Sequence, residues 1–178
     1  MEDKSEIRRE VRRRIKELSQ EQRANAAREI FNEIELREPF REAKCIALFV
    51  SMQDEVSTID ALRSWSEMGK RIVVPRVEGD IMRFYDYSPE RMQIGAFGIM
   101  EPTSNDEILA KEIDLIIVPA RAFTLSGIRL GRGGGFYDKY MSQPEFRAYK
   151  IGIAYKCQIF DTLPHALHDI KVDEVVFA

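Results

Sequence analysis

Short runs of almost purely apolar residues, separated by helical patterns, constrain the fold of this chain more than any other feature. The segments 45–50 and 113–119 carry apolar side chains at successive positions, apart from Asp114, whereas a strand with one wet face alternates apolar and polar residues. A strand that is apolar on both sides is typical of a parallel sheet covered by helices on both faces. We therefore expect an α/β fold, a three-layer α/β/α sandwich around a mainly parallel sheet.

Helical segments are predicted between these runs. Residues 4–18 carry apolar side chains at helical spacing. Ser19 and Gln22 form a capping-box pattern that opens a second helix, which must end before Pro39. Further helices are predicted from Ser57 or Thr58 to Gly69, over 105–111 and from Phe136 onward, and further strands over 71–75, 81–87, 151–155 and 174–177.

The size and charge of the chain exclude several classes of protein. Its 178 residues suit one domain, spanning 1–178. A net charge of −3 argues against a protein that mainly neutralises nucleic-acid phosphates. No apolar run reaches the ~18 residues of a membrane span, and the charged N-terminus is unlike a signal peptide. Cys45 and Cys157 both lie in strand-like apolar runs, as small core residues of a reducing compartment do. We expect a cytoplasmic protein without nucleic-acid or membrane partners.

A glycine cluster at 131–135 is the strongest functional signal. Four of the ten glycines of the chain lie there, on either side of Arg132. Backbone N–H groups in such a loop approach a ligand closely, and arginines beside them favour a phosphate-sized anion. Asp138 follows within one helical turn and is placed to hold a metal ion. The cluster matches neither a P-loop nor a dinucleotide fingerprint, and a purely structural turn is the alternative interpretation.

The loops that follow the predicted strands point to one shared site. Residues 51–55, Arg76 and residues 120–138 each come directly after a strand. Ligands of parallel α/β sheets bind beyond the carboxyl ends of the strands. We therefore expect these three segments to meet.

The segment 129–138, Arg-Leu-Gly-Arg-Gly-Gly-Gly-Phe-Tyr-Asp, resembles the signature of the 5-formyltetrahydrofolate cyclo-ligase (5,10-methenyltetrahydrofolate synthetase) family. The resemblance extends in order along nearly the whole chain. It includes Lys4 with Arg8, the loop 51–55, Gly69-Lys70, Pro75-Arg76, Glu101-Pro102, the run 114–119, Ala122-Phe123, Gly127, His168-Asp169 and the segment 172–175.

The resemblance implies a Rossmann-like fold of the NagB/RpiA/CoA-transferase kind and an enzyme that uses ATP and Mg²⁺. In this reaction the γ-phosphate of ATP passes to the formyl oxygen of 5-formyltetrahydrofolate, N10 attacks the activated carbon, and 5,10-methenyltetrahydrofolate forms. Phosphoryl transfer requires positioning and charge neutralisation rather than a protein nucleophile. The partners implied are the folate and ATP, and we expect a monomer.

The resemblance also assigns residues to roles. It implies that Arg132 and Lys4 act in catalysis and that Asp138 and Asp169 hold Mg²⁺. The residues implied for ATP are Lys4, Arg8, Arg129, Leu130, Gly131, Arg132, Gly133, Gly134, Gly135, Phe136 and Tyr137. Those implied for the folate are Val50, Met52, Glu55, Phe97, Arg132, Gly133, Gly134, Gly135, Phe136 and Tyr155.

Several of these positions also have a plain structural interpretation. Lys4 and Arg8 could belong to a solvated basic face, Asp169 to a helix cap or turn, and Phe97 to the core. The chain departs from the family after Pro119, where Ala120-Arg121 replaces a glycine, and at Thr124, where an acidic residue is usual. Arg121 could contact a phosphate or a glutamate tail, or could be exposed.

Two other functions compete with the ligase. A nucleotide- or RNA-binding relative without turnover would be expected to lose Asp138, Glu55 or Lys4, and all three are present. A sugar-phosphate isomerase or acyl-transfer enzyme would need a general base or nucleophile near the glycine cluster. It would not need Lys4 and Arg8.

Overall fold

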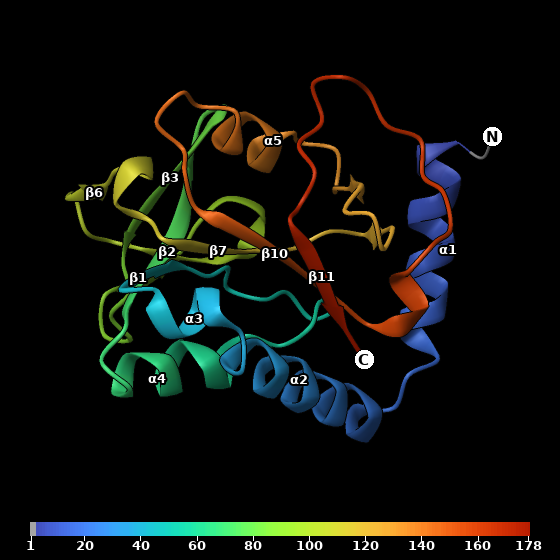
Figure 1. The fold of residues 1–178 in the computed structure, drawn as a ribbon, viewed down its shortest axis with the longest axis horizontal. Helices are drawn as coiled ribbons and strands as arrows, with labels where there is room; N and C mark the ends of the chain where they lie inside the picture. The colour runs from blue at the N-terminus through green and yellow to red at the C-terminus, as the bar shows by residue number, and fades with distance from the viewer. Residues whose placement is uncertain (1–2) are drawn as a thin grey trace.

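The computed structural model describes residues 3–178, which fold around a seven-stranded sheet (Figure 1). The strand order is β11-β10-β7-β1-β2-β3-β6. The first five strands are parallel to one another, β3 is antiparallel to β2, and β6 is antiparallel to β3. The strands are β1 (Cys45–Ala47), β2 (Arg71–Glu78), β3 (Ile81–Asp86), β6 (Glu107–Ile108), β7 (Leu115–Val118), β10 (Tyr149–Ala154) and β11 (Glu174–Phe177). The mainly parallel sheet is therefore confirmed.

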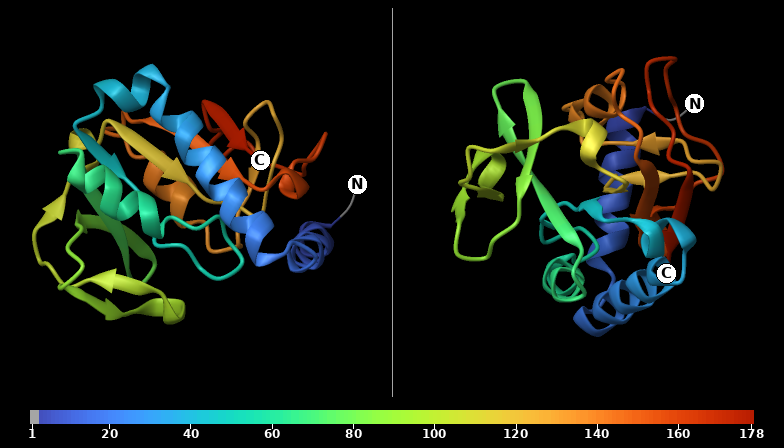
Figure 2. Two further views of the ribbon diagram at one scale, coloured as in Figure 1. Left: turned by 90° about the horizontal axis from the view of Figure 1, so that it is seen from below. Right: turned by 60° about the vertical axis from the view of Figure 1, so that its left-hand side comes forward.

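Successive residues of the central strands face opposite layers of the molecule. In the register of β1 with β7, Ile46 pairs with Leu115 and Ala47 pairs with Ile116. Ile46 and Leu115 pack in the core on the side of helices α2 (Gln20–Glu35) and α4 (Ile59–Glu67). Ala47 and Ile116 pack in the other core, with helix α5 (Phe136–Met141). Figures 1 and 2 show these helices on the two sides of the sheet, so the three-layer arrangement is confirmed.

The two predicted helix starts differ in how they are capped. Ser19 caps α2 as predicted, because its Oγ accepts from the Gln22 N–H at 3.0 Å while the Gln22 side chain accepts from the Ser19 N–H at 2.8 Å. Thr58 occupies the N-cap position of α4, but its hydroxyl donates instead to the Phe49 carbonyl oxygen at 2.7 Å. That bond fastens the loop after β1 to the helix that follows it.

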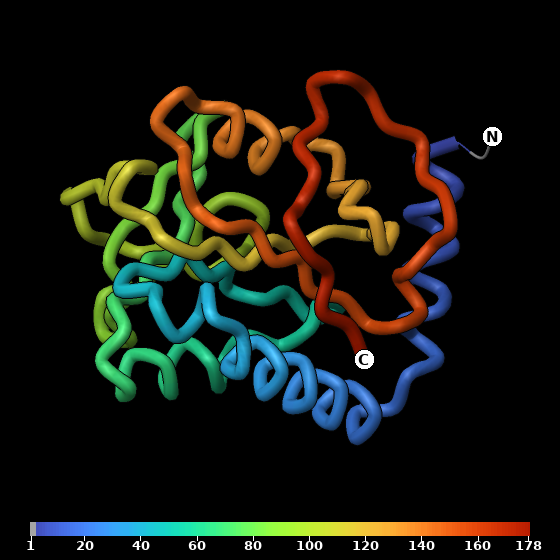
Figure 3. The backbone as a smooth tube through the Cα atoms, in the orientation of Figure 1, coloured from blue at the N-terminus to red at the C-terminus, as the bar shows by residue number. Residues whose placement is uncertain are grey.

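Helix α1 (Lys4–Lys16) stands apart from the sheet layers (Figure 1). Its buried residues Ile7, Val11 and Ile15 join the larger core. The helix lies against the small hairpin of β8 (Ala122–Phe123) and β9 (Arg129–Leu130) and against the 3₁₀ turn η3 (Lys156–Gln158). In Figure 3 the chain after η3 runs alongside α1.

One predicted helix is wrong. Residues 105–111 do not form a helix; they contain the short edge strand β6, followed by the 3₁₀ turn η2 (Ala110–Glu112). Ile108 is buried and pairs with Phe84 of β3, and Leu109 has extended backbone angles. A helical stretch this short is marginal by itself, so the sheet edge takes the segment instead.

Cys157 also departs from the prediction. It lies in η3 and not in a strand, and it is half-buried, whereas Cys45 is a buried residue of β1 as expected. Both thiols are free, and burial raises the pKa of Cys45 to about 11.

The chain also contains two short elements that the sequence did not reveal. These are helix α3 (Glu38–Glu42) and the hairpin of β4 (Met92–Ile94) and β5 (Met100–Pro102), which is joined by the turn η1 (Ala96–Gly98). Arg76 of β2 donates to the carbonyl oxygens of Pro102 at 2.9 Å and Ser104 at 2.6 Å. These bonds hold the chain that follows the hairpin against the sheet. None of the helices in residues 3–178 has the length and apolar composition that a membrane crossing requires.

Candidate functional site

The glycine loop (131–135) and helix α1 meet directly. Arg8 Nε of α1 donates to the Gly131 carbonyl oxygen at 2.8 Å. A Cβ atom added to Gly133 would lie 3.8 Å from the Arg8 guanidinium, so the two residues are close neighbours. Lys4 begins the same helix, one turn before Arg8. The two basic residues that the sequence singled out at the N-terminus therefore lie on the helix that borders the glycine loop.

The glycine loop has a backbone that few other residues would tolerate. Gly133 has a φ of +113° and Gly135 has a φ of +72°, the left-handed region that favours glycine. Gly135 is the N-cap residue of α5. Residues 132–135 are all exposed, so the loop presents its backbone at the surface and not in the core.

Arg132 and Arg121 share one carboxylate. Arg132 Nη2 is 2.7 Å from Asp54 Oδ1, and Arg121 Nη2 is 2.6 Å from Asp54 Oδ2. Burial raises the pKa of Asp54, but the hydrogen bonds from Arg132 and Arg121 outweigh it, so the pKa lies below its usual value. Asp54 belongs to the loop after β1, which the bridge therefore joins to the glycine loop.

Five arginines gather around one small cavity, which we call the cationic pocket. Its volume is about 250 Å³, and it is lined by Ser5, Arg8, Arg9, Arg12, Arg121 and Arg132. In the described part of the chain, no carboxylate is among its lining residues. Asp54 pairs with two of these five arginines, so positive charge is in excess here. Such an excess is suited to a polyanion such as a nucleotide phosphate.

Glu55 is a buried acid next to Arg132. Its side chain is 11% exposed, and its Oε2 lies 3.7 Å from Arg132 Nη2. The Met52 N–H donates to Glu55 Oε1 at 2.7 Å, and this bond lowers the pKa of Glu55. Burial outweighs it, so the pKa of Glu55 is raised above its usual value. The hydroxyl of the buried Tyr155 donates to the Glu55 carbonyl oxygen at 3.2 Å. Hydrogen bonds thus connect Glu55 to both Met52 and Tyr155.

Arg129 lies beneath the glycine loop. Its side chain is 6% exposed, and its Nε and Nη2 donate to the Pro119 carbonyl oxygen at 3.3 and 3.2 Å. Its Nη1 is 3.4 Å from Asp138 Oδ1, and its guanidinium lies 5.5 Å from the centre of the Tyr137 ring. Burial lowers the pKa of Arg129 and raises that of Tyr137. The arginine is therefore placed to hold Asp138 rather than to reach the surface.

The two predicted metal ligands lie near each other. Asp138 Oδ1 accepts the N–H of Ile170, the residue after Asp169. Asp169 Oδ2 accepts the N–H of Ala166 at 2.8 Å. Within residues 3–178, no three His, Cys, Asp or Glu side chains are grouped so as to hold a metal ion by themselves. Two carboxylates still fit Mg²⁺, which commonly takes one or two carboxylates together with substrate phosphates.

Two aromatic rings meet at the far side of the glycine loop. Phe97 is 70% exposed, which contradicts its interpretation as a core residue. Its ring centre lies 6.2 Å from that of Phe136. Phe97 also has a φ of +59°, in the left-handed region where a bulky residue is strained. Val50 is half-buried in the loop after β1, whereas the side chain of Leu130 lies in the core.

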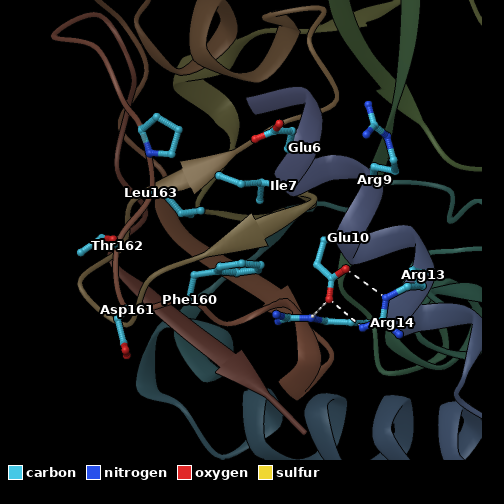
Figure 4. Close-up of a pocket in the computed structure, with 11 residues that line it drawn as sticks. Glu6, Ile7, Arg9, Glu10, Arg13, Arg14, Phe160, Asp161, Thr162 and Leu163 are labelled. Carbon is cyan, nitrogen blue, oxygen red and sulfur yellow. Dashed lines mark hydrogen bonds and ion pairs between the residues drawn. The ribbon is translucent and has the colours of Figure 1, made fainter. Parts of the chain in front are cut away.

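A larger cavity, which we call the outer groove, lies on another flank of α1, and Arg9 lines both cavities (Figure 4). Its volume is about 1000 Å³. Glu10 accepts there from Arg13 and Arg14, and the guanidinium of Arg14 lies 4.8 Å from the centre of the Phe160 ring. Its lining comes from the helix and from residues 160–164: Glu6, Ile7, Arg9, Glu10, Arg13, Arg14, Phe160, Asp161, Thr162, Leu163 and Pro164.

Sequence reasoning left Arg121 open and did not single out Asp54. Arg121 is not exposed: its side chain is 7% exposed and faces Asp54 and the cationic pocket. Their pairing joins residues far apart in the chain, and no local pattern predicts it. The hydroxyl of Thr124 lies 2.8 Å from the Ser126 hydroxyl and accepts the Ile128 N–H at 3.1 Å. Thr124 therefore holds the turn of the β8–β9 hairpin.

Comparison with known proteins agrees with this arrangement. The model of the 5-formyltetrahydrofolate cyclo-ligase family matches residues 1–178. The 5-formyltetrahydrofolate cyclo-ligase of Mus musculus is 32% identical, over 96% of this chain and 91% of the mouse protein. That of Escherichia coli (strain K12) is 28% identical, over 93% of this chain and 95% of its own.

Solved structures give the same result. The 5,10-methenyltetrahydrofolate synthetase of Aquifex aeolicus superposes with a TM-score of 0.86 at 34% identity, covering 98% of this chain and 89% of that one. The enzyme of the same name from Mycoplasma pneumoniae superposes with a TM-score of 0.80 at 26% identity, covering 98% of each chain. With its sequence matched from end to end and its fold shared, the chain belongs to the 5-formyltetrahydrofolate cyclo-ligase family.

Proposed function

We propose that the protein catalyses the ATP-dependent cyclisation of 5-formyltetrahydrofolate to 5,10-methenyltetrahydrofolate, with release of ADP and phosphate. The γ-phosphoryl group passes to the formyl oxygen, N10 attacks the formyl carbon and gives up its proton, and the carbon–oxygen bond breaks as phosphate leaves with that proton. The amide oxygen is a poor leaving group until it is phosphorylated. The protein must therefore align two substrates and neutralise charge.

The cationic pocket and the glycine loop are the proposed site of the ATP phosphates. Arg8 and Arg132 line the pocket, and Lys4 lies one turn from Arg8 on α1. Arginine N–H groups and exposed loop amides stabilise charge as it develops on a transferring phosphoryl group. Arg132 is the residue that borders both the pocket and Glu55, so we assign it to the reacting phosphate.

Asp138 and Asp169 are proposed to hold Mg²⁺. When bound, the ion would neutralise phosphate charge and orient the triphosphate. The buried Arg129 side chain contacts Asp138 Oδ1, and this contact orients the carboxylate before any ligand is present. The buried arginine thus acts through Asp138 and not on the nucleotide.

The folate is proposed to bind beside Glu55. The Glu55 carboxylate is fixed by the Met52 N–H and can accept from N–H donors of a pterin ring. Tyr155 fixes the backbone at Glu55, and Val50 lies in the same loop. The aromatic pair Phe97 and Phe136 offers ring faces for a flat aromatic substrate.

One observation carries this proposal: Arg132 of the glycine loop lies 3.7 Å from Glu55 of the loop after β1. The proposed phosphate-binding and folate-binding halves therefore meet at the Arg132 guanidinium, which we assign to act between them. A binding protein without turnover would not require this contact. A cytoplasmic location, a monomeric state and the lack of nucleic-acid partners stay predictions.

The direct test is an absorbance assay. Purified protein with 5-formyltetrahydrofolate, ATP and Mg²⁺ should develop the near-ultraviolet absorbance of the methenyl product. Reactions without ATP and reactions without the metal ion are the two controls, and each should show no signal. No absorbance change with active folate, ATP and metal present would overturn the proposed function.

A further inference from the structure

Asp54 lies between two arginines of unequal freedom. Arg121 is fixed on both its side chain and its backbone: its side chain is 7% exposed, and its N–H donates to the Leu130 carbonyl oxygen at 2.8 Å. Its own carbonyl oxygen accepts from Gln158 Nε2 at 3.1 Å. Arg121 is therefore built into the edge of the β8–β9 hairpin and presents its guanidinium in one place.

Arg132, in contrast to Arg121, has a side chain that is free to move. It stands between Gly131 and Gly133 in the exposed glycine loop, and its side chain is 37% exposed. Its side-chain partners are the two acids of the loop after β1, Asp54 at 2.7 Å and Glu55 at 3.7 Å. A side chain in such a loop can move without disturbing a packed core.

The charges around Asp54 exceed what one carboxylate needs. A polyphosphate entering the cationic pocket competes with Asp54 for Arg132, since both offer oxygen acceptors to the same guanidinium. If Arg132 leaves, Arg121 remains 2.6 Å from Asp54, so the carboxylate is not left unpaired. Without Arg121, Asp54 would have Arg132 as its remaining arginine partner and would hold it more strongly.

We propose that Arg121 and Asp54 are a pair of positioning residues that keeps Arg132 available to the nucleotide. Asp54 holds Arg132 at the rim of the pocket in the free protein. Arg121 supplies the counter-ion that lets Arg132 move to the phosphates. The inference rests on the proposed function, because it concerns the nucleotide of that same site.

A double-mutant cycle tests the pair, with binding of Mg²⁺–ADP measured by titration calorimetry. Arg121→Met should weaken ADP binding roughly five- to ten-fold, because Asp54 then sequesters Arg132. Asp54→Asn should leave the affinity equal or tighter. The double variant should recover the affinity of Asp54→Asn, since the competing charge has gone. Arg121→Lys, which keeps the counter-ion, should stay within about two-fold of the original protein.

Arg9→Met is the matched control, because it removes a positive charge from the same pocket without touching Asp54. Its loss of affinity should persist in combination with Asp54→Asn. A double variant of Arg121 and Asp54 that binds as weakly as Arg121→Met, or more weakly, would overturn the inference. So would an Arg121→Met variant with unchanged affinity.

Turnover separates the two proposals. In the assay Arg121→Met should raise the KM for ATP while kcat stays close to that of the original protein, because saturating ATP outcompetes Asp54. A normal absorbance assay with an additive cycle overturns this inference alone. ADP binding with the expected cycle but no methenyl product overturns the proposed function alone. If the original protein neither binds ADP nor forms the methenyl product, both are wrong.

Discussion

Both flanks of α1 carry arginines, but they differ in how that charge is balanced. In the outer groove, Glu10 accepts from Arg13 and Arg14, and hydrogen bonds from these two residues lower the pKa of Glu10 to about 2. On the cationic pocket side, Arg8 donates to the carbonyl oxygen of Gly131 instead of to a carboxylate. Five arginines line that pocket and Asp54 pairs with only two of them, so a ligand can supply the remaining negative charge. The outer groove is the larger cavity, but Arg13 and Arg14 are already paired with Glu10 there, so it is the weaker candidate for a polyanion site.

The largest effect should follow the loss of Arg132. We expect Arg132→Ala to lower kcat about 10²- to 10³-fold, because charge on the transferring phosphoryl group loses its donor. Folate binding, measured by fluorescence quenching or calorimetry, should change far less. Equal losses in turnover and in folate binding would contradict the role assigned to the pocket side.

The acids of the two sides should differ as well. Asp138→Asn should raise the Mg²⁺ concentration for half-maximal activity roughly ten-fold, because a metal-binding charge is lost. Glu10→Gln is the matched control, since Glu10 neutralises arginines in the outer groove, and its metal requirement should match that of the original protein. An unchanged requirement in Asp138→Asn would remove this residue from the metal site.

A pair of arginine variants compares the flanks directly. Arg8→Met should raise the KM for ATP roughly five-fold through the loss of a charged donor. Arg13→Met removes the same charge from the other flank, where Arg13 pairs with Glu10 and Glu17. Steady-state kinetics should show no change in KM for Arg13→Met. Equal effects of the two variants would mean that only the net charge of the helix matters.

The smallest effect concerns stability. Burial raises the pKa of Glu55, so the folded state disfavours its ionised form. Glu55→Gln should therefore stabilise the ligand-free protein by about 1 kcal/mol at neutral pH, or roughly 2–4 °C in Tm. The gain should shrink as the pH falls through the raised pKa toward the ordinary value of a glutamate, because the folded state then binds the proton.

Thermal melts at neutral pH and near pH 4 measure this difference. Glu10→Gln, in the outer groove, should not raise the Tm at either pH, because Glu10 gains from ionisation through Arg13 and Arg14. A destabilised Glu55→Gln at neutral pH would show that Arg132 stabilises the charged acid more than burial penalises it.

The sequence predicted the parts of the molecule that rest on local patterns. Apolar runs at 45–50 and 113–119 predicted strands buried on both faces, and the Ser19–Gln22 pair predicted a helix start. The segment 105–111 was misread because pairing of Ile108 with Phe84, a long-range contact, decided its structure.

The site was predictable to a similar extent. The glycine cluster and its family resemblance singled out the loop, Arg8 and Glu55, which the fold brings together through Arg132. The Arg121–Asp54 pair was not predictable, because 66 residues separate the two in the chain and no local pattern links them. The burial of Arg129 was also hidden, since a signature motif does not reveal which of its arginines face inward.

The proposed contact of Phe97 with the folate has a consequence for the entropy of binding. Its left-handed backbone and its edge contact with Phe136 restrict an exposed ring before any substrate is present. A ring that is already ordered loses less conformational freedom when a flat ligand packs on it. The backbone strain at Phe97 is therefore already present in the folded, ligand-free protein. The proposed folate surface needs no reordering of this ring when the substrate binds.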